Sequence, residues 1–155
     1  HYQRCDHPVE TCLLINDAAD AVLERGIGRR VPLTEVEQVL RHANERGLVH
    51  LTIYDPQQYV YAVCSCCSCC CHDLQFLKRY GRSDLIAQSE YVAQTDMDVC
   101  IHCGDCVERC VFDARIWRDG QIDYDVEACY GCGLCVTICP VEATTMERRG
   151  HSGKD

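Results

Sequence analysis

The chain has 155 residues, 16 of them cysteine, and its 15 basic and 24 acidic residues give a formal net charge of −9. This acidic balance argues against nucleic-acid binding, which needs basic patches, and the longest apolar stretches are far shorter than the roughly 20 residues of a membrane-spanning helix. A cysteine content of about one residue in ten is typical of a disulfide scaffold or a metal protein.

The first 81 residues (1–81) are predicted to form a small, cysteine-rich α/β module that binds metal. Asn16 can cap a short helix that ends at Gly26. Residues 34–37 read Thr-Glu-Val-Glu, which is a capping box, and they open an amphipathic helix that Gly47 closes.

Two strands and a third helix complete this module. Residues 48–54 and 59–63 are rich in β-branched and aromatic residues and lie on either side of an Asp-Pro turn signal. The second strand leads directly into the run CSCCSCCC at residues 64–71. A helix is expected over residues 72–80, ended by Gly81.

Half of the cysteines lie in this first module, and we predict that they bind metal. They are Cys5, Cys12, Cys64, Cys66, Cys67, Cys69, Cys70 and Cys71. Neighbouring and i+2 cysteines rarely meet the geometry of a disulfide, which favours metal ligation and a reducing compartment, the cytoplasm of an anaerobic cell.

The kind of metal centre in the first module stays open at this point. One reading is one or two additional iron–sulfur clusters, including non-cubane types. Another is a zinc site formed by Cys5, Cys12 and two cysteines of the run. A redox-active thiol centre and a set of simply buried thiols are the remaining alternatives. Because side chains alternate in direction along an extended chain, the six cysteines of the run cannot all reach one small ion.

The other half of the cysteines form two runs of the pattern C-x₂-C-x₂-C-x₃-C. The runs are Cys100, Cys103, Cys106 and Cys110, followed by Cys129, Cys132, Cys135 and Cys139. All four cysteines of the second run follow their counterparts by 29 residues, so the segment is an internal duplication. Three cysteines on a tight loop can hold three irons of one cubane, whereas the x₃ step points the fourth cysteine away from it.

Strand signals surround these runs. Residues 91–95 are expected to form a strand, and residues 115–124 a hairpin that turns at Asp119-Gly120. Residues 144–147 are expected to form a closing strand, and a short helix should follow the third cysteine of each run. These elements predict two βαβ-like halves.

Residues 96–148 resemble a bacterial ferredoxin with two [4Fe–4S] clusters, on the strength of the eight cysteines in register. The resemblance implies an α+β fold with duplicated βαβ-like halves, a linker at 82–90, a ferredoxin domain at 91–148 and a tail at 149–155. It also implies the ligands of each cluster. Cluster I would use Cys100, Cys103, Cys106 and Cys139, and cluster II would use Cys129, Cys132, Cys135 and Cys110. Val111 stands where the family usually has proline. Two Cys₄ zinc sites are the alternative, although zinc ribbons usually space their C-x₂-C pairs further apart.

The order of motifs along the whole chain is also similar to the C-terminal part of larger cysteine-rich iron–sulfur proteins of anaerobes. The similarity rests on residues 5–12 and 47–50, followed by the cysteine-dense run and the ferredoxin-like segment. It implies a further N-terminal portion that carries more cysteines.

Together these features predict an electron-transfer protein or subunit that relays single electrons through two [4Fe–4S] clusters and a further metal centre. Its partners would be redox proteins within a larger oxidoreductase complex, and the acidic balance favours basic ones. The alternative is an oxidoreductase subunit whose reaction centre is a non-cubane cluster at CSCCSCCC. No acid–base set for such a reaction is identifiable in the sequence.

Overall fold

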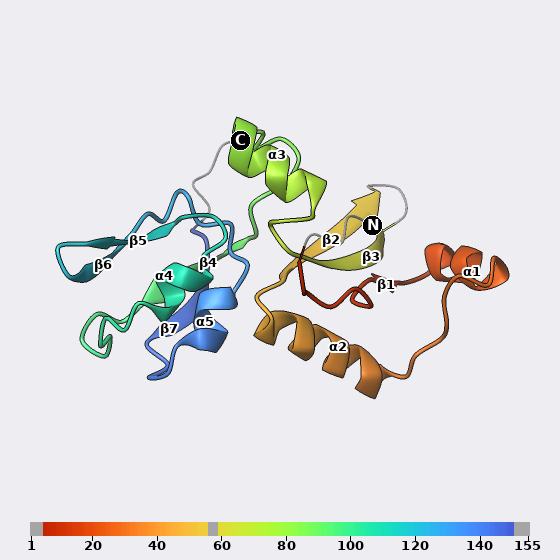
Figure 1. Ribbon diagram of the computed structural model, residues 1–155, viewed down its shortest axis with the longest axis horizontal. Helices are drawn as coiled ribbons and strands as arrows, with labels where there is room; N and C mark the ends of the chain where they lie inside the picture. Colours follow the sequence, from red (N-terminus) through yellow and green to blue (C-terminus); the bar gives the residue numbers. More distant parts are fainter. Residues whose placement is uncertain (1–4, 56–58, 151–155) are drawn as a thin grey trace. The chain divides into compact units, whose positions relative to one another are not determined.

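The computed structural model describes residues 5–55 and 59–150 (Figure 1). The chain divides into two compact units, His1–Cys71 and His72–Asp155, and each is described by itself. None of the helices in the described ranges is long and apolar enough to cross a membrane.

The first unit is built on a three-stranded antiparallel sheet with the order β1-β3-β2. Its strands are β1 (Leu13–Leu14), β2 (Val49–Asp55) and β3 (Tyr59–Cys66). The central strand β3 is longer than the sequence predicted, because its pairing with β2 continues as far as Cys66, which lies opposite Val49. The first three residues of the cysteine run are therefore part of the sheet.

Two helices of the first unit confirm the sequence prediction, although their caps differ from it. They are α1 (Asp17–Glu24) and α2 (Leu33–Glu45). Asn16 precedes α1 without capping it, since its side-chain amide donates a hydrogen bond to the Val60 carbonyl oxygen (3.1 Å) instead. Pro32 is the N-cap of α2 and its carbonyl accepts from the Glu35 amide (3.0 Å). This moves the start of α2 ahead of the predicted capping box.

The second unit contains one longer helix followed by a strand–helix–strand order that occurs twice. Its elements are α3 (His72–Tyr80), β4 (Tyr91–Thr95), α4 (Asp105–Arg109), β5 (Arg115–Arg118), β6 (Gln121–Tyr124), α5 (Leu134–Ile138) and β7 (Thr144–Arg148). Strand β4 pairs with β7 and β5 pairs with β6, in both cases antiparallel. The predicted strands and hairpin of this segment are confirmed to within a residue.

A small core holds the two halves of the ferredoxin-like segment together. Val92 and Ala93 of β4 pack with Ala114 and Cys129, and all four residues are buried. One of the predicted cluster ligands therefore belongs to the hydrophobic core itself, where side chains are closely packed and fixed in position.

The boundary between the units lies between Cys71 and His72, so helix α3 belongs to the second unit, whereas the sequence assigned it to the first. Residues 82–90 contain no helix or strand. Two hydrogen bonds join them to the loop of the second cysteine run, from Ser89 N to Tyr130 O (3.1 Å) and from Gln88 Nε2 to Glu127 O (2.8 Å). Of the predicted tail at 149–155, residues 151–155 lie outside the described residues.

Candidate metal centres

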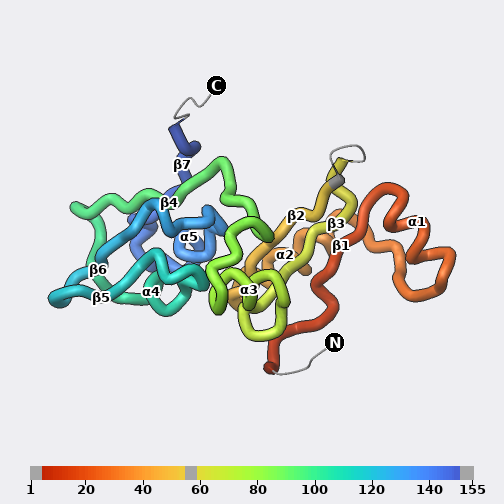
Figure 2. The backbone as a smooth tube through the Cα atoms, turned by 90° about the horizontal axis from the view of Figure 1, so that it is seen from above, coloured from red at the N-terminus to blue at the C-terminus, as the bar shows by residue number. Residues whose placement is uncertain are grey.

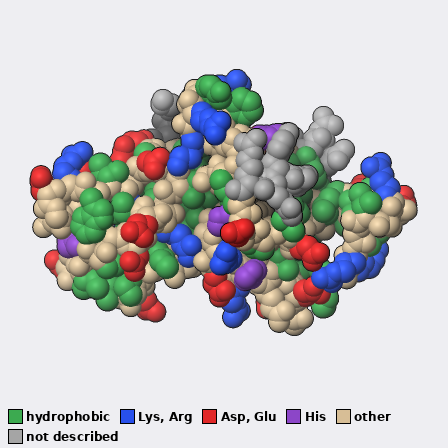
Figure 3. Space-filling view, in the orientation of Figure 1, with side chains coloured by type: hydrophobic (Ala, Val, Ile, Leu, Met, Phe, Trp, Pro, Cys, Tyr) green, Lys and Arg blue, Asp and Glu red, His purple; other side chains and the backbone are tan. Residues whose placement is uncertain are grey.

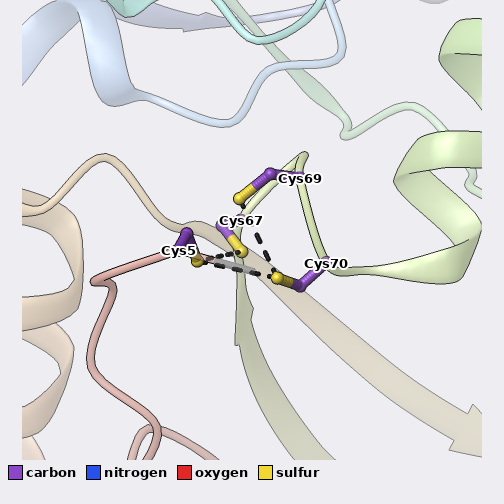
Figure 4. Close-up of side chains that lie close together, drawn as sticks. All are labelled: Cys5, Cys67, Cys69 and Cys70. Carbon is purple, nitrogen blue, oxygen red and sulfur yellow. Dashed lines mark hydrogen bonds between the residues drawn. The ribbon is translucent and has the colours of Figure 1, made fainter. Parts of the chain in front are cut away.

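Four thiols of the first unit lie close together at the end of β3. Cys5, Cys67, Cys69 and Cys70 have their sulfur atoms within 4.8 Å of one another (Figure 4). The Sγ atom of Cys5 is 3.7 Å from that of Cys67 and 3.6 Å from that of Cys70. Among the residues described, no other group of three or more potential metal ligands is as tight as this one, here called the Cys5 group.

The turn after β3 explains how consecutive cysteines converge. The Cys70 and Cys71 amides both donate to the Cys67 carbonyl, at 3.4 and 3.1 Å, so the chain folds back on itself. Cys5 comes from the other end of the unit, and the N-terminal segment, red in Figure 2, runs back to this turn. Three ligands are thus local, whereas the fourth is distant in sequence.

The spacing of the Cys5 group fits one tetrahedral metal ion. A Zn–S bond of about 2.3 Å in tetrahedral geometry places thiolate sulfurs about 3.8 Å apart, and the sulfur–sulfur distances that Cys5 makes are 3.6 and 3.7 Å. Thiolates bound to four different irons of a cubane stand farther apart than that. Four sulfurs in a tetrahedron suit zinc or a single iron.

Three thiols of the Cys5 group have shifted pKa values. A hydrogen bond from the His7 amide, helped by the neighbouring thiols, lowers the pKa of Cys5. Burial is the main cause that raises the pKa of Cys67 and of Cys69. Because a metal binds the thiolate, binding would displace the remaining protons from this group.

In the second unit, one cysteine of the first run lies with three of the second. Cys110, Cys129, Cys132 and Cys135 line one cavity with about 340 Å³ of space between atoms, part of it open to solvent. Burial is the first cause that raises the pKa of Cys132, to about 11, and the charges of the other three thiols raise it further. The four sulfurs thus face a common space.

Backbone amides favour a thiolate at this cavity. The pKa of Cys129 is lowered, although burial alone would raise it. Hydrogen bonds from the Ala93 and Gly131 amides to the Cys129 sulfur contribute to this lowering. The Gly131 nitrogen is 3.4 Å from the Cys129 sulfur. Amide–sulfur hydrogen bonds of this kind also tune iron–sulfur clusters.

The other four cysteines of the two C-x₂-C-x₂-C-x₃-C runs are arranged around the first loop and the end of α5. Cys100 and Cys103 are close enough to Cys106 for their charges to raise its pKa, after burial, which is the larger cause. Cys139 follows α5, where hydrogen bonds from the amides of Val141, Ala143 and Thr144 overcome burial and lower its pKa. Trp117 of β5 lies against the backbone of Gly104 and covers the first loop.

Arg115 is a site residue that sequence analysis did not identify. It is only 2% exposed, its Nη1 atom is 3.9 Å from the sulfur of Cys106, and its guanidinium lies 4.4 Å from the centre of the Tyr124 ring. Its charge also interacts with Cys135. A signal was present in the sequence, since Arg115 and Trp117 are two residues apart in β5 and therefore share a face.

His102 has a structural contact that was also not foreseen. Its Nδ1 atom accepts a hydrogen bond from the Ile122 amide (3.1 Å), which ties the first cysteine loop to the hairpin. His102 adopts a left-handed backbone conformation with φ 49°. This contact fixes the loop between Cys100 and Cys103.

Comparisons with known proteins agree with this geometry over one part of the chain. Residues 92–140 match the family described as a 4Fe-4S dicluster domain. A search of curated proteins found no match to the chain. The matched residues contain all eight cysteines of the two C-x₂-C-x₂-C-x₃-C runs. The donor set fits iron–sulfur ligation, because it consists of thiols in a largely apolar cavity. Residues 92–140 are therefore an iron–sulfur segment of the ferredoxin-like type.

Proposed function

We propose that the protein is an electron carrier, or an electron-transfer subunit, that relays single electrons through two [4Fe–4S] clusters in its second unit. The observation that carries the proposal is the cavity lined by Cys110 together with three cysteines of the second run. A cysteine that leaves its own run for the other one is what an interlocked pair of clusters requires.

Each residue of the second unit has a definite part in this function. Cluster II would be held by Cys110, Cys129, Cys132 and Cys135, and cluster I by Cys100, Cys103, Cys106 and Cys139. A [4Fe–4S] cluster, when bound, supplies reversible uptake and release of one electron. The chain contributes thiolates, amide hydrogen bonds to sulfur and a largely apolar enclosure, which together set the potential and exclude water.

In the first unit we propose a single metal ion held by the Cys5 group, in place of a further cubane. The close sulfur–sulfur distances within the group support this choice. Zinc there would be structural, and iron would add a one-electron site. A module of this size with a small core gains stability from a metal that links distant segments.

The partners would be redox proteins with a basic docking surface, within a larger oxidoreductase complex. The net charge of −9 supports this expectation, because a strongly acidic protein attracts a basic partner before contact. Bound clusters with four thiolates each would add negative charge.

The test is metal and sulfide analysis of protein purified without oxygen, together with EPR spectroscopy during stepwise reduction. We expect about eight acid-labile sulfides per chain and two reversible one-electron signals. Cys110→Ser should remove the signal of cluster II and leave that of cluster I. Cys103→Ser should remove the signal of cluster I and leave that of cluster II. Protein that contains zinc but no sulfide, or that shows no reversible reduction, would overturn the proposal.

A further inference from the structure

Four cysteines of the first unit lie outside the Cys5 group and contact one another. The thiol of Cys12 shares a hydrogen bond with that of Cys64, Cys64 shares one with Cys66, and Cys66 shares one with Cys71. These contacts form a continuous row of four sulfurs, here called the Cys12 row. Clustered thiols without a metal oxidise readily, so a row of this kind needs an explanation.

The register of the sheet accounts for one half of the row. Strand β1 runs antiparallel to β3 with Leu13 opposite Val63, which brings the preceding residue, Cys12, next to Cys64. Cys64 and Cys66 are two residues apart in β3 and therefore project from the same face. Three sulfurs of the row are thus placed by strand pairing.

Two further contacts hold the ends of the row. The Thr11 hydroxyl donates a hydrogen bond to the Ser65 carbonyl (3.2 Å) and keeps the segment before β1 against β3. The hydrogen bond from the Cys71 amide to the Cys67 carbonyl (3.1 Å) closes the turn and returns Cys71 to Cys66. Within this turn, Cys69 and Cys70 belong to the Cys5 group.

The eight cysteines of the first unit therefore divide into two groups of four. Strand β3 and the turn after it direct Cys64, Cys66 and Cys71 to one group, and Cys67, Cys69 and Cys70 to the other. The segment before β1 supplies the fourth member of each, Cys12 and Cys5. Four thiols are the complement that a structural site for a soft metal ion uses.

We propose that Cys12, Cys64, Cys66 and Cys71 form a second metal centre, separate from the Cys5 group, for one thiophilic ion, Zn²⁺ or Fe²⁺. Thiolates select such ions over Mg²⁺ or Ca²⁺. Binding forms metal–sulfur bonds and releases the thiol protons without any change of oxidation state. Cys12 is exposed, which gives the ion an entry path.

The centre can be tested on the full chain by native mass spectrometry, which weighs each bound metal directly, and by sulfide analysis. The double variant Cys12→Ser/Cys64→Ser should lose one metal ion and keep the ion of the Cys5 group. The double variant Cys5→Ser/Cys67→Ser should show the reverse. Metal analysis identifies the ion as zinc or iron. Ser68→Ala, a change within the same run, should keep both ions.

Several results would overturn this centre. They are an unchanged metal count in the Cys12/Cys64 variant, the loss of both ions in either variant, and the loss of sulfide together with the ion. The inference is independent of the proposed site at the Cys5 group, since each site has its own variant and its own ion to lose. Far-ultraviolet circular dichroism reports whether each variant has folded. Where a double variant fails to fold, Cys12→Ser and Cys5→Ser alone supply the same comparison.

Discussion

At the scale of single residues, Arg115 is the least expected member of the ferredoxin-like segment. A buried charge is costly unless it is paired, and within the described ranges Arg115 makes no ion pair with a carboxylate. Its ionisable neighbours include the thiols of Cys106 and Cys135, one from each proposed cluster site. The guanidinium is therefore placed to stabilise negative charge on both sites at once.

Replacing Arg115 should make both clusters harder to reduce. A hydrogen bond to a charged group is worth about 1.5–3 kcal/mol, and about 1.4 kcal/mol corresponds to 59 mV for one electron. We expect Arg115→Met to lower both midpoint potentials by about 60–130 mV, measured by EPR during a redox titration, and Arg115→Lys to lower them less.

The matched control for this experiment lies on the same strand. Arg118 is exposed and pairs with Asp123 (2.9 Å), so Arg118→Met should leave both potentials unchanged. Equal shifts in the Arg115 and Arg118 variants would assign the effect to net charge rather than to the buried contact.

Gly131 provides a second prediction at this scale, with Gly133 as its control. Both have a positive φ, of 70° and 76°, which costs a residue with a Cβ atom about 1–2 kcal/mol. A Cβ atom at Gly131 would also collide with the Tyr91 carbonyl and the Ser89 side chain, whereas at Gly133 it would meet nothing within 4 Å.

We therefore expect Gly131→Ala to destabilise the second unit by several kcal/mol and Gly133→Ala by only about 1–2 kcal/mol. The measurement is the temperature at which the iron–sulfur absorbance is lost, in anaerobic buffer. Equal losses in the two variants would show that the approach of Tyr91 is not a constraint.

At the scale of elements, local signals were sufficient for the second unit. The turn at Asp119-Gly120 and the alternation around it located β5 and β6, and the duplicated cysteine runs located the ferredoxin-like segment. In the first unit the sequence found α1, α2 and most of β2, but it ended β3 too early. The end of β3 was missed because a run of cysteines carries neither a strand nor a turn signal. Strand β1 was missed because it has only two residues.

The metal ligands of the first unit show why the rest could not be predicted. Cys5 and Cys67 are far apart in sequence, and no periodicity or spacing connects them. Their approach depends on the chain folding back after β3 and on the pairing of β1. The sequence indicated which residue type would bind metal, but not which four cysteines would share an ion.

His50 of β2 gives the sheet of the first unit a dependence on pH. Its Nδ1 atom is 2.9 Å from the Ser65 hydroxyl, and burial lowers its pKa below the usual value. The unfolded chain therefore binds this proton more readily than the folded one. At pH values above the pKa of His50 in the unfolded chain, about 6.5, this histidine does not affect stability. As the pH drops from there toward the pKa of His50 in the folded protein, stability falls.

We expect the melting temperature of the protein to fall between pH 7.5 and pH 5.5, and to fall less in His50→Gln. Because thiols and metal ions respond to pH in both proteins, the difference between the two slopes isolates the histidine. Melting is monitored by circular dichroism in the same buffers for both proteins. Identical slopes would show that His50 is protonated equally in the folded and the unfolded state.

At the scale of the whole molecule, the acidic balance bears on how the protein meets its partner. Acidic and basic side chains are intermingled on the face that Figure 3 shows, and the whole chain carries a net charge of −9. We expect electron transfer to a basic c-type cytochrome to slow by about tenfold when ionic strength rises from low to physiological values. Stopped-flow absorbance measures this rate.

An acidic flavodoxin serves as the matched acceptor for this test. Since two acidic proteins repel each other, its rate should rise with added salt, because salt screens the repulsion. A rate that is indifferent to salt with both acceptors would mean that charge has no part in docking.

The position of Cys110 also bears on how the protein is made. During synthesis Cys110 leaves the ribosome ahead of Cys129, Cys132 and Cys135, with which it shares a cavity. Until the last of these has emerged, the nascent chain exposes a thiol with no enclosure, open to oxidants. In the proposed arrangement, delivery of iron and sulfide to this site must therefore wait until Cys135 has emerged, and a product that stops within the hairpin at residues 115–124 lacks three of the four ligands.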